Sequence, residues 1–138
     1  MFLLDTNVIS ELSRPERADR NVSAWASAIP VTNFFLSVVT ILEIELGAFQ
    51  IARRDQAQGM ILRSWIDEQI LPRFDGRILG IDVAVAQRCA RLHVPDPRSE
   101  RDALIAATAL VHGLTVATRN ISDFEYSGVA VLNPWTSS

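Results

Sequence analysis

The sequence predicts an α/β fold, a three-layer α/β/α domain built on a five-stranded parallel sheet. Two observations lead to this prediction. Short runs of apolar, β-branched and aromatic residues, bounded by polar residues or glycine, alternate with segments of helical periodicity. The strand-like runs are continuously apolar, which is typical of parallel strands that helices cover on both faces. We expect residues 1–138 to form a single domain, since this length suits one hydrophobic core.

Each element is expected from its local residues. The expected strands are Phe2–Leu4, Phe34–Ser37, Ile78–Ile81, Thr115–Thr118 and Val129–Leu132. The first expected helix begins near Thr6–Asn7, and the others are Val22–Ala28, Ile41–Arg53, Gln56–Leu71, Val83–Leu92 and Ala103–His112. Thr40 opens the third of these helices, Pro72 ends the fourth, and Asp82 caps the start of the fifth. Gly113 follows the last helix as its C-cap.

Composition excludes several classes of protein. The net charge is −3, the pI is about 5.3, and all 13 basic residues are arginine. This balance argues against a passive nucleic-acid coat protein but allows an enzyme whose carboxylates hold metal ions. We expect no membrane span, because the longest apolar stretch is interrupted by His112 and Gly113. The single cysteine, Cys89, cannot form an internal disulfide and suits a reducing, cytoplasmic compartment.

Four acidic residues stand where such a sheet would place function. Asp5 directly follows the first strand, and Glu43 lies in the first turn of the helix after the second. Asp102 lies in the first turn of the helix that leads to the fourth strand, and Asp123 follows that strand. Open α/β sheets bind ligands beyond the carboxyl ends of their strands, at the point where the strand order reverses. If the order reverses between strands one and four, these acids converge.

Each acid also has an ordinary structural reading. Asp5 could cap the first helix, and Glu43 completes the capping-box pattern Thr40-x-x-Glu43. Asp102 could stabilise a helix dipole, and Asp123 could bond nearby backbone in a turn. The joint arrangement has a different explanation, because four carboxylates close together repel unless cations neutralise them. Carboxylates without histidine or cysteine favour Mg²⁺ or Mn²⁺ over zinc, and such ions can activate water against a phosphodiester.

Three segments carry a resemblance to a known family. They are LLDTNVISEL, TILEIELGA and RDALIAATALVHGLTVATRNISDF, and in this order they resemble the PIN-domain ribonucleases, most closely the VapC toxins, including the FitB-like branch. The resemblance implies an endoribonuclease dependent on Mg²⁺ or Mn²⁺. Asp5 and Asp102 would be the principal metal ligands, with Glu43 and Asp123 completing the acidic site. Asn7, Thr118 and Asn120 would be supporting polar groups, with Thr118 orienting a carboxylate.

The resemblance also implies partners. A cognate antitoxin protein would silence the toxin, the chain would form a homodimer, and operator DNA would be bound only through the antitoxin complex. From their positions beside Asp102 and Asp123, the arginines expected to contact RNA phosphates are Arg98, Arg101 and Arg119. The apolar spacing over Met60–Ile70 fits either core packing or a groove for an antitoxin helix.

Other protein classes fit the sequence less well. Receiver domains and haloacid-dehalogenase-like phosphatases need a lysine near the phosphoryl group, and this chain has no lysine. The glycine-rich phosphate loops of P-loop and Rossmann proteins are absent from the sequence. The remaining alternative is a PIN-fold binding module that acts mainly in an antitoxin–DNA complex, with little or no nuclease turnover.

Overall fold

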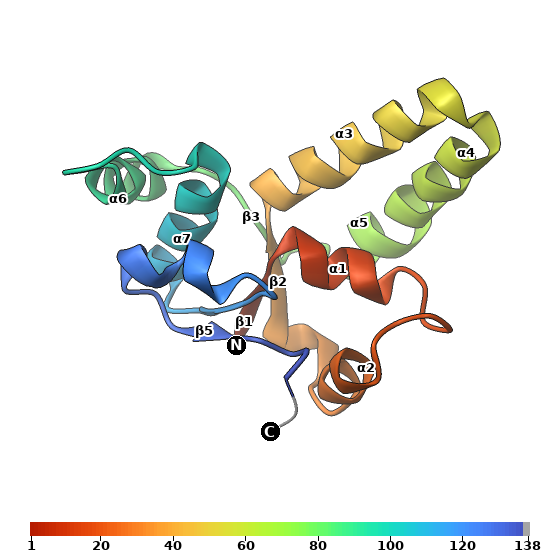
Figure 1. Cartoon of the computed structure of the whole chain (residues 1–138), viewed down its shortest axis with the longest axis horizontal. Helices are drawn as coiled ribbons and strands as arrows, with labels where there is room; N and C mark the ends of the chain where they lie inside the picture. The colour runs from red at the N-terminus through yellow and green to blue at the C-terminus, as the bar shows by residue number, and fades with distance from the viewer. Residues whose placement is uncertain (137–138) are drawn as a thin grey trace.

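The computed structural model, which describes residues 1–136, contains a parallel sheet of five strands in the order β3-β2-β1-β4-β5 (Figure 1). The strands are β1 (Phe2–Leu4), β2 (Phe34–Ser37), β3 (Ile78–Leu79), β4 (Thr115–Ala117) and β5 (Val131–Leu132). All four pairings are parallel. The predicted fold class is therefore confirmed. That residues 1–138 form one domain stays a prediction.

Strand β1 lies at the centre, where the strand order reverses. Phe2 pairs with Phe34 of β2 on one side, and Leu4 pairs with Ala117 of β4 on the other. The backbone N–H of Asp5 then donates to the carbonyl of Ala117 at 2.9 Å. The carboxyl ends of β1 and β4 are thus direct neighbours, as the prediction of a shared site required.

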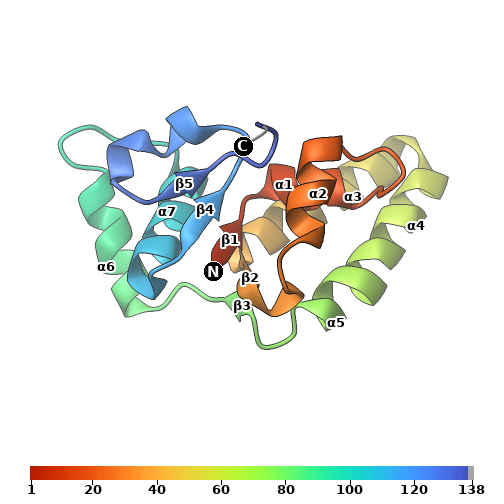
Figure 2. The ribbon, with the colours of Figure 1, turned by 90° about the horizontal axis from the view of Figure 1, so that it is seen from below.

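Helices cover both faces of the sheet. Along the chain they are α1 (Thr6–Leu12), α2 (Arg20–Ser27), α3 (Val38–Arg54), α4 (Gln56–Trp65), the π-helical segment Ile66–Ile70, α5 (Leu71–Arg73), α6 (Val83–Leu92) and α7 (Glu100–His112). Short 3₁₀ turns cover Val31–Asn33, Ile121–Asp123 and Glu125–Ser127. Helices α6 and α7 lie on one side of the sheet and α1 to α5 on the other (Figure 2). None of the helices formed within residues 1–136 is both long and apolar enough to cross a membrane.

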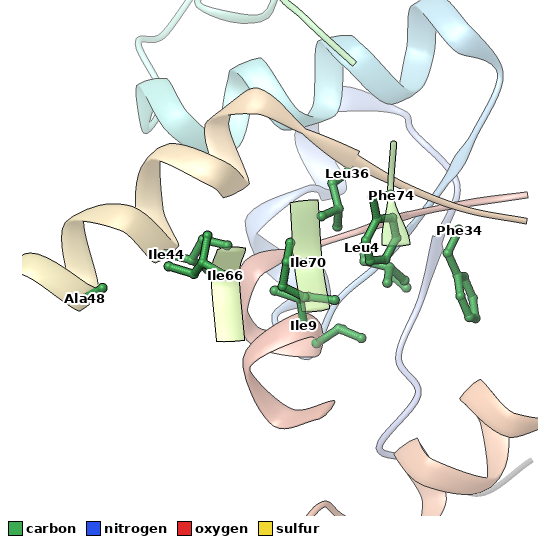
Figure 3. Close-up of a cluster of buried hydrophobic side chains, with 11 residues drawn as sticks. Leu4, Ile9, Phe34, Leu36, Ile44, Ala48, Ile66, Ile70 and Phe74 are labelled. Atoms are coloured by element: carbon green, nitrogen blue, oxygen red, sulfur yellow. The ribbon is translucent and has the colours of Figure 1, made fainter. Parts of the chain in front are cut away.

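Alternation along β1 divides the core between the two faces. Leu4 packs with Ile9 of α1, Ile44 of α3 and Ile70 in one cluster (Figure 3). The preceding residue, Leu3, belongs to a second cluster that packs under α7. Because successive side chains of a strand point to opposite faces, a three-residue strand serves both clusters.

Several helices and strands begin or end at residues other than those predicted. Helix α3 begins at Val38, not at Ile41, because the Ser37 hydroxyl caps it by accepting the Val39 N–H at 3.0 Å. Helix α7 begins at Glu100, three residues before the expected start. Strands β3, β4 and β5 are shorter than predicted, since interstrand pairing covers only part of each apolar run.

Pro72 does not end the fourth helix as predicted. The chain passes from α4 through a π-helical segment into α5, and Pro72 lies in the first turn of α5, where its missing N–H is tolerated. The predicted caps Asp82 and Gly113 are confirmed. Asp82 accepts the Val85 N–H at 3.0 Å, and Gly113 takes the left-handed conformation with a φ of 67°.

Two helical glycines offer a matched test of the packing between α3 and α4. A Cβ built on Gly59 would lie 2.4 Å from the Cβ of Ala52, whereas one on Gly47 would meet nothing within 4 Å. We expect Gly59→Ala to lower the free energy of unfolding by about 1–3 kcal/mol, despite the better helix propensity of alanine. Gly47→Ala should raise it by about 0.5–1 kcal/mol. Denaturant unfolding of both variants checks this, and equal effects would show that the helices do not pack this closely.

Candidate functional site

Asp5 is both a helix cap and a buried carboxylate at the end of β1. Its side chain is 7% exposed. One carboxylate oxygen, Oδ1, accepts the N–H of Thr6 at 2.8 Å, which caps α1. The other, Oδ2, accepts the hydroxyl of Thr118 at 2.8 Å and the amide of Asn7 at 3.3 Å. The capping reading is therefore correct, but it accounts for only one of the two oxygens.

The predicted supporting residues form a network around Asp5. The fully buried Thr118 hydroxyl donates to Asp5 and accepts the backbone N–H of Asn120 at 3.0 Å. The Asn7 side chain contacts Asp5 through its Nδ2 atom and accepts the Arg119 N–H at 3.2 Å through its Oδ1 atom. Asn7 and Thr118 thus act through side chains, whereas Asn120 contributes its backbone. Hydrogen bonds from Thr118, directly after β4, and from α1 hold the carboxylate in one orientation.

Glu43 reaches the same region from α3, but not as a capping-box residue. Since α3 begins at Val38, Thr40 lies inside the helix and Glu43 lies beyond its first turn, so both expectations were wrong. The Thr6 hydroxyl donates to Glu43 Oε1 at 2.6 Å and also lies 3.3 Å from the Thr40 hydroxyl. Thr6 therefore links the start of α1 to α3. Sequence reasoning missed this role, because a threonine at a helix start has an ordinary explanation.

Asp102 and Asp123 complete a group of four that we call the acidic cluster. Asp102 lies in the first turn of α7 as predicted, and Asp123 ends a 3₁₀ turn after β4. Burial raises the pKa of Asp102, and the charges of the other three carboxylates raise it further.

Burial likewise raises the pKa of Asp5. The hydrogen bonds from Thr118 and Thr6 oppose this rise, and the charges of Glu43 and Asp123 add to it. The charges of acids that are distant in sequence thus act on Asp5 and Asp102, while the role of the four as site residues stays a prediction.

The chemistry of this cluster fits a hard divalent cation. Its donors are all carboxylate oxygens, which Mg²⁺ and Mn²⁺ prefer, and a cation would relieve the repulsion that adds to the effect of burial on the pKa values of Asp5 and Asp102. Across residues 1–136, no three Asp, Glu, His or Cys side chains form a group that could hold a metal ion as the side chains stand. The metal prediction therefore rests on donor chemistry and mutual repulsion, and not on a preformed set of three ligands.

The three predicted RNA-contacting arginines have different surroundings. Arg101 lies 3.7 Å from Glu43 Oε2 and forms an ion pair at the edge of the cluster. The Arg98 guanidinium lies 4.5 Å from the ring centre of Tyr126, and that of Arg119 lies 5.1 Å from the ring centre of Trp135. Their contact with RNA stays a prediction.

Tyr126 was not singled out from the sequence. Its hydroxyl is buried and has no hydrogen-bond partner among residues 1–136. Burial raises its pKa, and the charge of Asp102 raises it further, with a smaller opposing effect from Arg98. No local pattern marks this tyrosine, because Arg98, Asp102 and Cys89, which act on it, are distant in sequence.

Comparison with known proteins identifies similar chains. The model of the PIN domain family matches residues 2–125. Toxin FitB of Neisseria gonorrhoeae is 40% identical over 141 residues, which cover 98% of this chain and 99% of that protein. VapC ribonuclease Y4jK of Sinorhizobium fredii is 37% identical over 140 residues, with 98% of each chain covered. The solved structure of FitAB bound to the IR36 DNA fragment is 37% identical with a TM-score of 0.90, covering 100% of this chain and 98% of that chain.

The role of Thr118 can be tested by removing its hydroxyl alone. Thr118→Val leaves a buried carboxylate without one of its donors, so we expect the free energy of unfolding at neutral pH to fall by about 1–3 kcal/mol. Thr118→Ser keeps the hydroxyl and serves as the control. Urea unfolding compares the two, and a loss that is no larger for valine than for serine would contradict the hydrogen bond to Asp5.

The raised pKa of Asp102, caused first by burial and then by the neighbouring carboxylates, predicts a pH-dependent stability. Because the folded protein raises the pKa of Asp102, protons bind the folded state more strongly, and ionised Asp102 destabilises the fold above that pKa. In EDTA at neutral pH, we expect Asp102→Asn to unfold at a higher temperature than the unmodified protein. This advantage should shrink as the pH falls through the folded pKa towards the ordinary value of 3.8.

Added divalent cation should reverse the order. At about 100 times its dissociation constant, Mg²⁺ or Mn²⁺ should stabilise the unmodified protein by about 2.7 kcal/mol, and the variant by less. Thermal unfolding across pH, with and without the ions, measures both effects. An advantage of Asp102→Asn that did not change with pH would contradict the raised pKa of Asp102.

Proposed function

This chain belongs to the PIN-domain family, and on that premise we propose that it is a Mg²⁺- or Mn²⁺-dependent endoribonuclease that acts as the toxin of a toxin–antitoxin pair. The observation that carries the proposal is the convergence of Asp5, Glu43, Asp102 and Asp123 beside the neighbouring ends of β1 and β4. Support also comes from the similarity to Toxin FitB and to a VapC ribonuclease over nearly the whole chain.

The residues of the acidic cluster have different proposed roles in binding a metal ion. Asp5 and Asp102 would be its principal ligands, and Glu43 and Asp123 would complete the site. When bound, the ion would activate water for attack on an RNA phosphodiester and stabilise the leaving oxygen. Thr118 and the Thr6 N–H fix the Asp5 carboxylate beforehand, so little reorganisation is needed at that ligand. Arg101 beside Glu43 supplies positive charge next to the acids, where a phosphate can approach.

An antitoxin is the proposed protein partner. We assign its contact to an apolar groove of about 570 Å³ between α1, α2 and the α4–α5 arm. Residues that line the groove include Ile9, Leu12, Ala26, Trp65 and Ile70. An amphipathic helix suits such a groove, because it can bury one apolar face there.

The segment Met60–Ile70, for which core packing and an antitoxin groove were both open, contributes residues to the core and to the groove proposed here. Ile66 and Ile70 belong to the buried core, and Trp65 and Ile70 line the groove. Met60, at the other end, is exposed. Because FitAB, to which this chain is similar, was solved bound to a DNA fragment, we assign operator DNA to the complex with antitoxin.

The homodimer contact is assigned to the outer face of α3. Leu42, Leu46 and Phe49 share one side of this helix by their spacing and are 53%, 37% and 62% exposed. Exposed apolar side chains gathered on one face of a helix are typical of a protein interface. This face lies on the arm formed by α3 and α4 (Figure 1).

A cleavage assay tests the nuclease. The purified protein, freed of any bound partner, is incubated with a mixed panel of structured RNAs in Mg²⁺ or Mn²⁺ and in EDTA. We expect cuts that require the ion and that fall at least about 100-fold in Asp5→Asn and in Asp102→Asn. Asp75→Asn is the matched control, because it removes the same charge from an exposed residue outside the cluster.

The outcomes separate the nuclease from the binding module. Unimpaired cleavage by Asp5→Asn would remove that residue from the site. Ion binding without cleavage would point to a narrow target outside the panel. Neither ion binding nor cleavage would favour the alternative function, a PIN-fold module that acts mainly in an antitoxin–DNA complex, which the FitAB–DNA similarity and the apolar groove support.

A further inference from the structure

Arg119 is held directly beside the acidic cluster. It follows Thr118, whose hydroxyl donates to Asp5. The Arg119 N–H donates to Asn7 Oδ1 at 3.2 Å, and the Arg119 carbonyl accepts from Asn133 Nδ2 at 3.4 Å. Its main chain is thus tied to α1 on one side and to the segment after β5 on the other, while the residue itself is exposed.

Trp135 is held at the same end of the sheet. The Thr118 N–H donates to the Leu132 carbonyl at 2.9 Å, so the segment after β5 leaves the sheet next to the end of β4. The Trp135 N–H donates to Asn133 Oδ1 at 2.9 Å, and the Trp135 carbonyl accepts from Asn21 Nδ2 of α2 at 2.7 Å. The ring is half-buried against the cluster that contains Leu4.

The guanidinium of Arg119 lies over this ring, 5.1 Å from its centre. Within residues 1–136, the ion pairs made by arginine side chains involve Arg63 and Arg101, so no Asp or Glu side chain of this part of the chain pairs with Arg119. A planar cation held on an aromatic ring can take a phosphate through paired N–H groups, and its outer face can stack on a base. Arg98 has an aromatic neighbour too, but it reaches the cluster from the loop before α7.

We propose that Arg119 and Trp135 form a nucleotide-binding platform that holds an unpaired RNA nucleotide next to the phosphodiester bond at the acidic cluster. The inference rests on the proposed function, in which RNA is the substrate. The guanidinium takes the phosphate of that nucleotide, and its base stacks on the platform. A base inside a duplex is already stacked and cannot reach it, so the platform selects nucleotides that are unpaired or flipped out.

Asn7 couples this platform to the acids. Its side chain contacts Asp5 Oδ2 through one atom and the Arg119 N–H through another. The Arg119 main chain and the Asp5 carboxylate therefore keep a fixed mutual position. Arg119 and Trp135 are accordingly assigned to binding and specificity, and their loss should raise KM more than it lowers kcat.

Binding is measured in the Asp102→Asn background, so that RNA is not consumed. An unstructured, fluorescently labelled RNA decamer is titrated by anisotropy at several salt concentrations. We expect Arg119→Gln to weaken binding about 10-fold and to lower the slope of log K against log salt by about 0.7, the value for one phosphate contact on a single strand. Arg119→Lys should keep the slope of log K against log salt but lose part of the affinity, because lysine retains the charge but lacks the planar guanidinium.

Variants of Trp135 distinguish the contribution of stacking to RNA binding from that of charge. Because Trp135 supports the guanidinium on which the base stacks, Trp135→Leu should weaken binding about 5-fold with an unchanged salt slope, and Trp135→Phe should retain part of the affinity. Arg53→Gln is the matched charge control, since Arg53 is exposed in the last turn of α3, and it should bind as the parent does. Thermal unfolding of each variant shows that it is folded under the binding conditions.

Each result decides the inference. Weaker binding by the Arg119 and Trp135 variants, with normal binding by Arg53→Gln, supports it. Parental affinity in those variants with only a lowered Tm would show that the pair merely fastens the C-terminal segment, and would overturn it, as would no RNA binding by the parent. If the parent binds RNA through this pair but the chain with Asp102 intact cuts no RNA, the platform stands and the nuclease fails. The two conclusions are therefore distinguishable.

Discussion

The buried carboxylate of Asp5 is the constraint around which the carboxyl end of the sheet is organised. Asp5 is only 7% exposed, so its carboxylate loses most of its hydration. The protein must therefore supply the hydrogen bonds that water would otherwise donate. Replacement comes from the Thr118 hydroxyl, the Thr6 N–H and the Asn7 amide. These donors can meet only if β1 and β4 are parallel neighbours and α1 starts immediately after β1, so the topology and this one side chain depend on each other.

The residues at this end of the sheet both stabilise the fold through hydrogen bonds and destabilise it through buried carboxylates. Thr6 begins α1 and bridges to Glu43 on α3, so a helix start doubles as a contact between two elements. Yet burial, with a further contribution from neighbouring carboxylates, raises the pKa values of Asp5 and Asp102, which costs stability when no cation is present. Such a cost at a strand end is expected where binding, rather than stability, decides which residues are kept.

Local charge resolves an apparent conflict in this protein. A chain with a net charge of −3 attracts RNA poorly over its whole surface, but two of its arginines lie beside the acidic cluster. Arg101 pairs with Glu43, and Arg119 is held over Trp135 beside the Asp5 network. Positive charge at a few fixed points can guide a phosphate to an acidic site without making the whole surface basic. The apolar groove lined by Ile9 and Trp65 belongs to the face under α1 to α5, so protein recognition can use a different surface.

Local residues determined most of the fold. Continuous apolar runs predicted parallel strands, Asp82 and Gly113 predicted helix ends, and the positions of Asp5 and Asp102 after strands and at helix starts predicted where the acids would lie. These features depend on neighbours in the chain, which a sequence displays directly. The capping box at Thr40 failed for the same reason, because Ser37, three residues earlier, offered an equally local cap and began the helix sooner.

Only the tertiary structure decided which distant side chains meet. Thr6 reaches Glu43, Arg119 lies over Trp135, and Tyr126 buries its hydroxyl near Asp102, and none of these pairs shares a helix or strand. Their contacts depend on the parallel register of β1 with β4 and of β4 with β5, and on how the helices pack across the sheet. Local propensity does not encode that register, since it is set by the packing of the whole core.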